Sequence, residues 1–476
     1  MSRVAFVLAF VLLCPTVAAQ QPKAPPDPKD ILSRAKVIAR ETSRLRGLRR
    51  RRRLKMGILT KDQILKHVEK KLGEDYTDQE IAAEADVLKL LGLLPGKLDY
   101  KKTVLTLMKE QVAGFYDPKT RRLNLAAWIP LDLQEPALAH EICHALQDQH
   151  FNLRRLVKPI KNNSDQQLAQ AALVEGDCTG VMVEYVLRKQ GLDLGSMPDS
   201  MAKTVRQNIA GQATGAFAAA PVYMRDTLMF PYIHGLEMVR KIRSRHPWRQ
   251  VNAMYRRPPR STEQVLHYDK YWQRERPTQV QRPRRPPPSL KGHALLREDV
   301  LGELQLSIFL AQGVSAAVAR RAAEGWGGDQ LAAYRRKPDP QEPDQPADAA
   351  GPLVVHLSTW DSDADALEFA NATRHVLRRR RLVPGVHGPG LWTYTEPQKP
   401  GAPRGPGKKT DPAEAPADKP GAAGQPRRWA VQLHDQHVLC LMAVPDDLFP
   451  ALLKEVWAHW RIDRRRVKAP KLEMKD

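Results

Sequence analysis

Five consecutive residues, His140-Glu141-Ile142-Cys143-His144, carry the residue types of a zinc hydrolase at the H-E-x-x-H spacing. Residues four apart lie on the same face of a helix, so His140 and His144 can bind one ion together. Zinc suits the pair because it accepts imidazole ligands, keeps an open position and lowers the pKa of bound water. Glu141 lies beside them and can take a proton from that water. The pattern therefore predicts a zinc site with Glu141 as the general base, against the alternative of two hydrogen-bonded core histidines.

A third ligand must come from another segment, and Glu175 is the strongest candidate. Residues 165–189 have the apolar spacing of a helix, and Glu175 falls on its apolar face. A carboxylate in that position is costly unless it is paired or binds a metal. Two alternatives stay open: an internal salt bridge between Glu175 and an arginine, and Asp177 as the ligand or as the acceptor for a ligand histidine's free N–H.

The chain resembles a largely uncharacterised group of bacterial exported zinc metallopeptidases that are gluzincin-like. The resemblance spans most of the chain after the first hundred residues and rests on residues 110–117, 140–151, 172–177, 230–232, 261–267 and 325–329. It implies ligand roles for His140, His144 and Glu175 and a base role for Glu141, without indicating a substrate. The chain departs from the group at Tyr268, where the group has proline, and at two cysteines discussed below.

The amino terminus predicts export. Arg3 precedes an apolar run over residues 4–19, and small residues precede Gln20, as in a cleaved secretory signal peptide at residues 1–19. The run is short for a membrane span, although an uncleaved anchor remains the alternative. No other segment is apolar enough to span a bilayer. The expected location is the periplasm, the cell envelope or the medium, with no transmembrane segment after cleavage.

The chain is strongly basic, with a formal net charge of +23 and arginine runs at residues 49–53, 378–381 and 464–466. No helix-turn-helix, zinc-finger or RNA-recognition pattern accompanies these runs. We therefore expect a peptide or protein substrate and loose contact with an anionic envelope surface, and no specific nucleic-acid partner.

Three cysteines remain after signal cleavage: Cys143, Cys178 and Cys440. This number argues against a disulfide framework. Cys143 is next to His144, and Cys178 is three residues after Glu175, so the two sulfurs are close if both helices meet at one metal. A Cys143–Cys178 disulfide, which an oxidising compartment permits, and a pair of buried thiols are both open.

The elements that must position these residues predict an α+β protein. A mainly helical, zincin-like metallopeptidase domain with a small sheet is expected at residues 31–275, after a linker at residues 20–30. A Pro/Arg-rich linker at residues 276–292 leads to a smaller α+β domain at residues 293–476, with a disordered insertion at residues 396–427. The expected elements are helices at residues 31–48, 61–72, 78–94, 100–112, 135–150, 165–189, 301–323, 363–382 and 446–460, a hairpin at residues 112–127, and strands at residues 330–334, 353–360, 391–395 and 428–444.

Two features of the expected cleft follow from zincin chemistry. An edge strand beside the zinc helix binds peptide backbone in zincins, and residues 123–126 are the candidate here, with a plain scaffold hairpin as the alternative. An oxyanion donor is also needed, and Tyr232 and His234 are the leading candidates.

The sequence thus predicts a zinc-dependent metallopeptidase that hydrolyses peptide bonds through a zinc-bound water activated by Glu141. The alternative is a non-catalytic exported envelope protein with a structural zinc site and a basic binding surface. A serine hydrolase is excluded because there is no G-x-S-x-G motif, and phosphate-binding and dinucleotide-binding glycine loops are absent as well.

Overall fold

The computed structural model describes residues 27–111, 114–126, 131–211, 215–338, 351–388, 390–397 and 426–463. The expected signal peptide at residues 1–19 and most of the linker at residues 20–30 and of the insertion at residues 396–427 lie outside the described residues. Within the described residues, no helix is long and apolar enough to cross a membrane.

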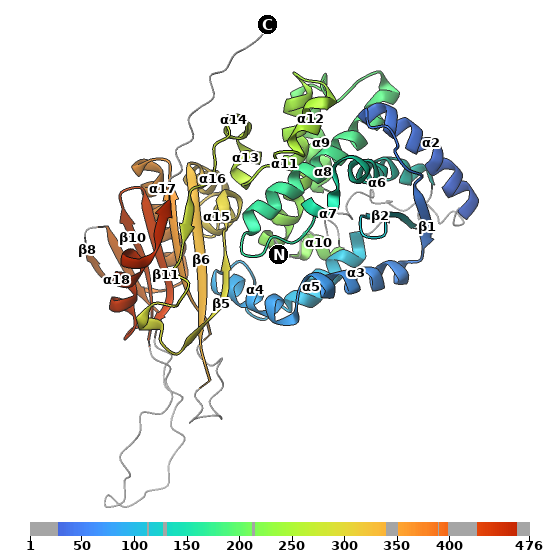
Figure 1. The fold of residues 1–476 in the computed structure, drawn as a ribbon. Coiled ribbons are helices and arrows are strands. Elements are labelled where there is room, and N and C mark those ends of the chain that lie inside the picture. Colours follow the sequence, from blue (N-terminus) through green and yellow to red (C-terminus); the bar gives the residue numbers. More distant parts are fainter. Residues whose placement is uncertain are drawn as a thin grey trace, which may run out of the picture. The chain divides into compact units, whose positions relative to one another are not determined.

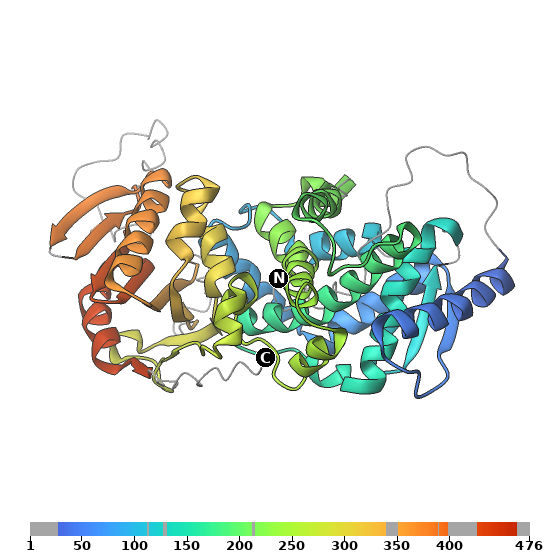
Figure 2. The ribbon, with the colours of Figure 1, turned by 90° about the horizontal axis from the view of Figure 1, so that it is seen from above.

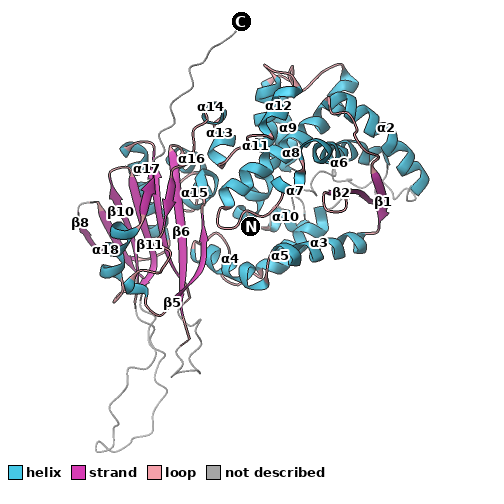
Figure 3. Ribbon diagram, in the orientation of Figure 1, coloured by secondary structure: helices cyan, strands magenta, loops and turns pink. Residues whose placement is uncertain are grey.

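The chain is an α+β protein that divides into two compact units (Figures 1 and 3). Among the described residues, the first unit runs to Pro277 and takes in Asp299–Phe309, and the second consists of Thr278–Glu298 and the residues from Leu310 onward. These divisions differ from the sequence boundaries at residues 275 and 293. Residues 278–298 are part of the second unit rather than a free linker, because they include strands of its sheets.

The first unit is mainly helical. Its helices are α2 (Pro28–Arg46), α3 (Lys61–Asp75), α4 (Asp78–Leu90), α5 (Tyr100–Gln111), α6 (Leu131–Phe151), α7 (Leu153–Leu156), α8 (Ser164–Leu187), η1 (Arg188–Gln190), α9 (Asp199–Gly211), α10 (Gly215–Ala219), α11 (Val222–Arg243), α12 (Trp248–Met254), α13 (Thr262–Leu266), α14 (Tyr268–Trp272) and α15 (Gly302–Leu310). Local sequence fixes several starts: Asp27, Thr60 and Thr77 each cap the helix that follows, the two threonines in capping boxes.

Helix α6 begins at Leu131, four residues before the sequence-predicted start, so Pro136 lies inside it rather than in its first turn. Its apolar residues join those of α2 and of a small sheet in one core cluster, which includes Ile38, Leu125 and Ile142. Because this core encloses α6 on several sides, the histidine motif is buried.

The small sheet has the strand order β1-β3-β2, from β1 (Lys55–Leu59), β2 (Gly114–Asp117) and β3 (Arg122–Ala126). The predicted hairpin of β2 and β3 is confirmed. The prediction that residues 123–126 form an open edge is wrong, because β1 pairs in parallel with β3 and makes it the central strand. Since β1 comes from residues far earlier in the chain, the hairpin pattern gave no sign of it.

The second unit is built on a seven-stranded sheet with the order β5-β6-β7-β11-β10-β9-β8. Its elements are β4 (Gln279–Gln281), η2 (Pro288–Leu290), β5 (His293–Asp299), α16 (Ala316–Ala323), β6 (Trp326–Arg336), β7 (Leu353–Trp360), α17 (Asp363–Arg379), β8 (Val383–Gly388), β9 (Leu391–Thr395), β10 (Arg427–His434), β11 (His437–Pro445), α18 (Phe449–His459) and β12 (Arg461–Asp463). A separate two-stranded ladder joins β4 to β12.

Side chains alternate across this sheet, so its two faces carry different helices. Leu353, Val355 and Leu357 of β7 belong to a cluster that includes Leu452 of α18. The opposite face meets α17, shown in orange in Figure 2, where Trp360 stacks on Phe369 at a ring separation of 4.5 Å. Both faces of the central strands are therefore covered.

The helix expected over residues 301–323 is two helices, α15 and α16, which belong to different units. α15 is held in the first unit by buried polar contacts: Gln305 accepts a hydrogen bond from Tyr223 Oη at 2.6 Å and donates to Ser164 Oγ at 2.9 Å. These long-range contacts are invisible in a local apolar pattern.

Candidate metal centre

Helix α6 carries the histidine motif through the interior of the first unit. His140, Glu141 and His144 expose 2%, 7% and 0% of their surface, and Glu175 of α8 exposes none. An unpaired buried polar group is costly, so four such groups in one place need partners. The structure places them against one another.

The position of Glu175 is set by a close crossing of α8 and α11, which lie side by side in Figure 1. The helices meet at Gly176 and Gly235. A Cβ atom added to Gly176 would lie 2.2 Å from the Gly235 carbonyl carbon, and one added to Gly235 would lie 2.2 Å from the Ala172 carbonyl oxygen. Only glycine allows this approach, which holds the neighbouring Glu175 at a fixed depth.

The donor atoms of the two histidines and Glu175 converge on one point. His140 Nε2 and His144 Nε2 are 3.0 Å apart, and Glu175 Oε2 lies 3.2 Å from the first and 3.4 Å from the second. Ligands held tetrahedrally by zinc at about 2.0–2.1 Å are about 3.3 Å from each other. The spacing of the three atoms therefore fits zinc without rearrangement.

A second observation agrees with this fit. The other carboxylate oxygen of Glu175, Oε1, is buried and has no hydrogen-bond partner among the described residues. No arginine contacts Glu175 in that part of the chain, so the salt-bridge alternative for this residue is not what the structure shows. An ionised, partly unsatisfied carboxylate beside two imidazoles is the donor set of a cation site.

The charges of the cluster are tightly coupled. Burial raises the pKa of Glu175, but the neighbouring His144 and His140 outweigh it and hold that pKa below its usual value. Burial lowers the pKa of His144, yet Glu175 more than offsets this and raises it to about 9. His140 keeps a lowered pKa, mainly because of burial. Without a cation, protonated His144 supplies the positive charge that pairs with the Glu175 carboxylate.

Glu141 is not one of the three converging ligands, but its carboxylate lies close to the two histidines. Its Oε2 accepts a hydrogen bond from the Tyr116 backbone N–H at 2.8 Å, so strand β2 fixes its orientation. Ligand-capable atoms of His140, Glu141 and His144 all lie within 4.8 Å of one another. Burial raises the pKa of Glu141 to about 8, and a cation in the cluster would favour its ionised form.

Gln147 selects the protonated nitrogen of His144. Gln147 Nε2 donates to the carbonyl oxygen of Val174 at 3.0 Å and to Asp177 Oδ2 at 2.9 Å. Its Oε1 therefore faces His144 Nδ1, at 3.0 Å, and this nitrogen must carry the proton. The proton that a metal must displace is therefore the one on His144 Nε2, and in the neutral ring the lone pair of this nitrogen is directed at the cluster.

Asp177 is not part of the ligand cluster; it anchors Gln147. It is fully buried and forms a two-point ion pair with Arg46 of α2, with Nε to Oδ1 at 2.7 Å. Tyr255 Oη donates to Asp177 Oδ2 at 2.7 Å. The sequence suggested that Asp177 accepts a hydrogen bond directly from a ligand histidine. In the structure Asp177 instead holds Gln147, and Gln147 contacts His144.

Cys143, Cys178 and Cys440 are all free and buried, so the disulfide expected as one reading of the sequence is not formed. Cys178 Sγ lies 3.3 Å from His144 Nδ1. Burial raises the pKa of both Cys143 and Cys178. They are therefore neutral thiols that fill the space behind the histidines.

Of the two oxyanion candidates, Tyr232 is the one that lies beside a histidine of the cluster. The Tyr232 ring is stacked against His140, with 6.2 Å between ring centroids, whereas His234 stacks on Phe230 at 5.0 Å. His267 forms a hydrogen bond with Glu303, with 2.8 Å between Nε2 and Oε1.

Several residues of the site were missed by sequence reasoning, and two had a signal. Gln147 is three residues after His144, on the same helix face. Arg46 lies on the apolar stripe of its helix, in step with Ile31, Ile38 and Thr42, where a charge requires a buried partner. Tyr116 and Tyr255 reach the site through tertiary contacts, and the sequence carried no signal for either of them.

Comparison with known proteins adds one finding. Residues 293–403 match a family described as a domain of unknown function (DUF8575). This match covers strand β5 to just beyond β9 and contains none of the residues of the candidate metal centre. No curated protein matches the chain. No solved structure matches it either.

Proposed function

We propose that the protein is a zinc-dependent metallopeptidase, gluzincin-like in its ligands, with His140, His144 and Glu175 holding the metal. The observation that carries the proposal is the convergence of three buried donor atoms at 3.0–3.4 Å. A proton shared among these groups would satisfy only part of them, since Glu175 Oε1 stays without a partner.

The chain's own residues then have separate tasks. Zinc, when bound, supplies Lewis acidity and lowers the pKa of a water molecule. Glu141 is the base that takes the proton from the attacking water and returns it to the leaving amine. Tyr116 holds Glu141 in place through its backbone N–H, and Gln147 keeps the His144 lone pair directed inward. Tyr232, beside His140, is the candidate donor to the developing oxyanion.

The burial of the site favours a second candidate. Glu141 exposes 7% of its surface and the metal-binding side chains 2% or less, so a peptide reaches them only if neighbouring segments move. A structural zinc site needs no such access, because no substrate has to reach the metal. The alternative is therefore a non-catalytic exported protein that keeps zinc for stability and binds partners through its basic surface.

Metal content and proteolysis together test the proposal. We expect about one zinc per chain by elemental analysis, much weaker retention in Glu175→Ala, and cleavage of casein that is lost in Glu141→Gln while zinc is kept. Glu135→Gln is the matched control, since Glu135 lies on the same helix but is half-buried and pairs with Arg34 and Lys189 instead of joining the cluster. The control should keep both zinc and activity.

Each result decides one part of the proposal. A folded wild-type protein without zinc would overturn the metal centre. Zinc that is retained with no cleavage of casein by the wild-type chain would favour the structural-zinc alternative. Equal loss of cleavage in Glu141→Gln and Glu135→Gln would remove the special role of Glu141.

A further inference from the structure

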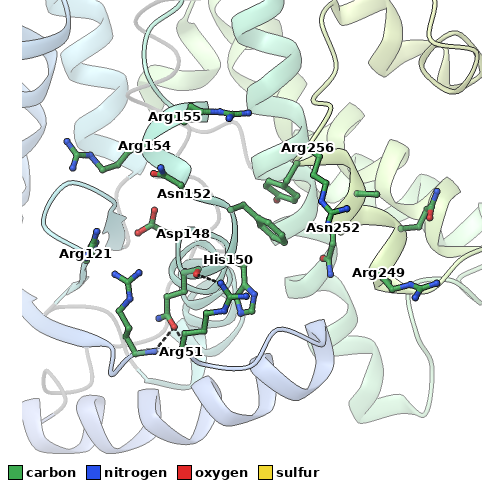
Figure 4. A pocket seen from close by; sticks show the side chains of 16 residues that line it. Arg51, Arg121, Asp148, His150, Asn152, Arg154, Arg155, Arg249, Asn252 and Arg256 are labelled. Atoms are coloured by element: carbon green, nitrogen blue, oxygen red, sulfur yellow. Dashed lines mark hydrogen bonds between the residues drawn. The ribbon is translucent and has the colours of Figure 1, made fainter.

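Seven arginines line one hollow of the first unit, at the carboxyl end of α6 (Figure 4). They are Arg51, Arg52, Arg121, Arg154, Arg155, Arg249 and Arg256. They come from the loop after α2, the turn between β2 and β3, helix α7, and α12 with the turn that follows it. Tertiary structure has gathered them, since only the first two belong to the arginine run at residues 49–53.

These guanidinium groups are not balanced by the protein. Within the described residues, none of the seven forms an ion pair with an aspartate or glutamate, whereas Arg34, Arg240 and Arg282 each do. The carboxylate in the hollow belongs to Asp148. It already accepts hydrogen bonds from Tyr116 Oη at 2.9 Å and the Leu153 backbone N–H at 3.0 Å. The hollow therefore holds a concentrated positive charge that a bound anion would relieve.

The size of the hollow suits a ligand larger than a single ion. Its volume is about 1140 Å³, slightly above the range of about 300–1,000 Å³ for small-molecule sites. A second hollow of about 1110 Å³ shares Arg155 and Arg256 with it. It is also lined by Arg257, Arg260, Arg274 and Arg276, against a single carboxylate, that of Glu275. The positive surface thus continues past the first hollow, as an elongated ligand requires.

We propose that this arginine-lined hollow binds a chain of phosphate groups. The planar guanidinium fork pairs with phosphate through two parallel hydrogen bonds, so consecutive phosphates can each meet one or more arginines. An acidic peptide fits less well, because extended peptides place successive side chains on opposite sides and only half of the carboxylates would face the arginines. None of His140, His144 and Glu175 lines the hollow, so the proposal does not depend on the metal.

Calorimetric titration of the full chain at fixed ionic strength tests the ligand class, with inorganic phosphate, inorganic triphosphate and ATP as probes. Triphosphate should bind at least about tenfold more tightly than phosphate, because it reaches more guanidinium groups. If ATP binds more tightly than triphosphate, the bound phosphate groups belong to a nucleotide. If ATP binds more weakly than triphosphate, the ligand is an inorganic phosphate chain. Equal affinity for phosphate and triphosphate, or equally tight binding of hexaglutamate, would overturn the proposal.

Two variants that lose the same number of charges test whether the ligand binds in this hollow. Arg52→Gln/Arg154→Gln/Arg256→Gln removes three exposed arginines of the hollow, and Arg320→Gln/Arg378→Gln/Arg379→Gln removes three exposed ones from α16 and α17. We expect triphosphate affinity to fall at least about tenfold in the first and within about twofold in the second. Thermal unfolding midpoints establish that both variants are folded. Equal losses in two folded variants would show general attraction to a basic chain and refute a site here.

Discussion

The buried ion pair between Arg46 and Asp177 should be a main support of the first unit. Both side chains are fully buried, with Nε to Oδ1 at 2.7 Å, and the Arg46 guanidinium lies 4.6 Å from the Trp248 ring. Burial lowers the pKa of Arg46, but the adjacent Asp177 more than offsets this, so the arginine stays charged. The substitution Arg46→Met keeps much of the volume and removes the charge.

The expected loss of unfolding free energy depends on the Asp177 charge that the substitution leaves unpaired. Removing one partner of a buried pair costs about 3–5 kcal/mol, because the other charge is stranded. Asp177 keeps its hydrogen bonds from Tyr255 and Gln147, so we expect a loss near the lower end, about 3 kcal/mol. Adding Asp177→Asn removes the stranded charge and should recover about 1–2 kcal/mol of this loss.

Urea unfolding followed by far-ultraviolet circular dichroism measures the effect, since most helices belong to the first unit. Lys101→Met is the control, because Lys101 pairs with Asp78 at 2.6 Å on an exposed surface, where such a pair contributes about 0–1 kcal/mol. If Arg46→Met destabilised the protein no more than Lys101→Met does, the buried pair would not be a support. A double variant less stable than Arg46→Met would refute the stranded-charge argument.

Three further predictions concern the proposed metal centre. Gly176→Ala should destabilise the first unit by about 1–3 kcal/mol, because its Cβ would overlap Gly235. Gly73→Ala, which meets nothing within 4 Å, should be neutral or slightly stabilising in the same urea assay; equal effects would contradict the close crossing. Gln147→Leu should weaken zinc binding by about 10–100-fold in a chelator competition, and unchanged affinity would show that Gln147 does not orient His144. Because the pKa of His144 is raised to about 9, zinc must displace its proton at neutral pH. Zinc affinity should therefore rise by up to about tenfold per pH unit and level off above the His144 pKa; a flat profile in competition titrations would rule out this proton.

Sequence alone determined the parts of this protein that depend on local pattern. The spacing of His140 and His144 on one helix, the apolar face that carries Glu175, and the hairpin of β2 and β3 all follow from periodicity and turn residues. The α+β class follows from the same signals, because helical and strand periods differ along the chain.

Tertiary structure decided what depends on contacts between distant segments. The pairing of β1 with β3 made a predicted edge strand central, and the placement of α15 in the first unit divided a predicted helix. Gly176 and Gly235 set the depth of Glu175, and Arg46, from residues far earlier in the chain, took Asp177 as its partner. Periodicity shows that a side chain is buried but not which group it meets, because that depends on how helices cross. The arginine-lined hollow has the same origin, since four separate segments contribute its charge.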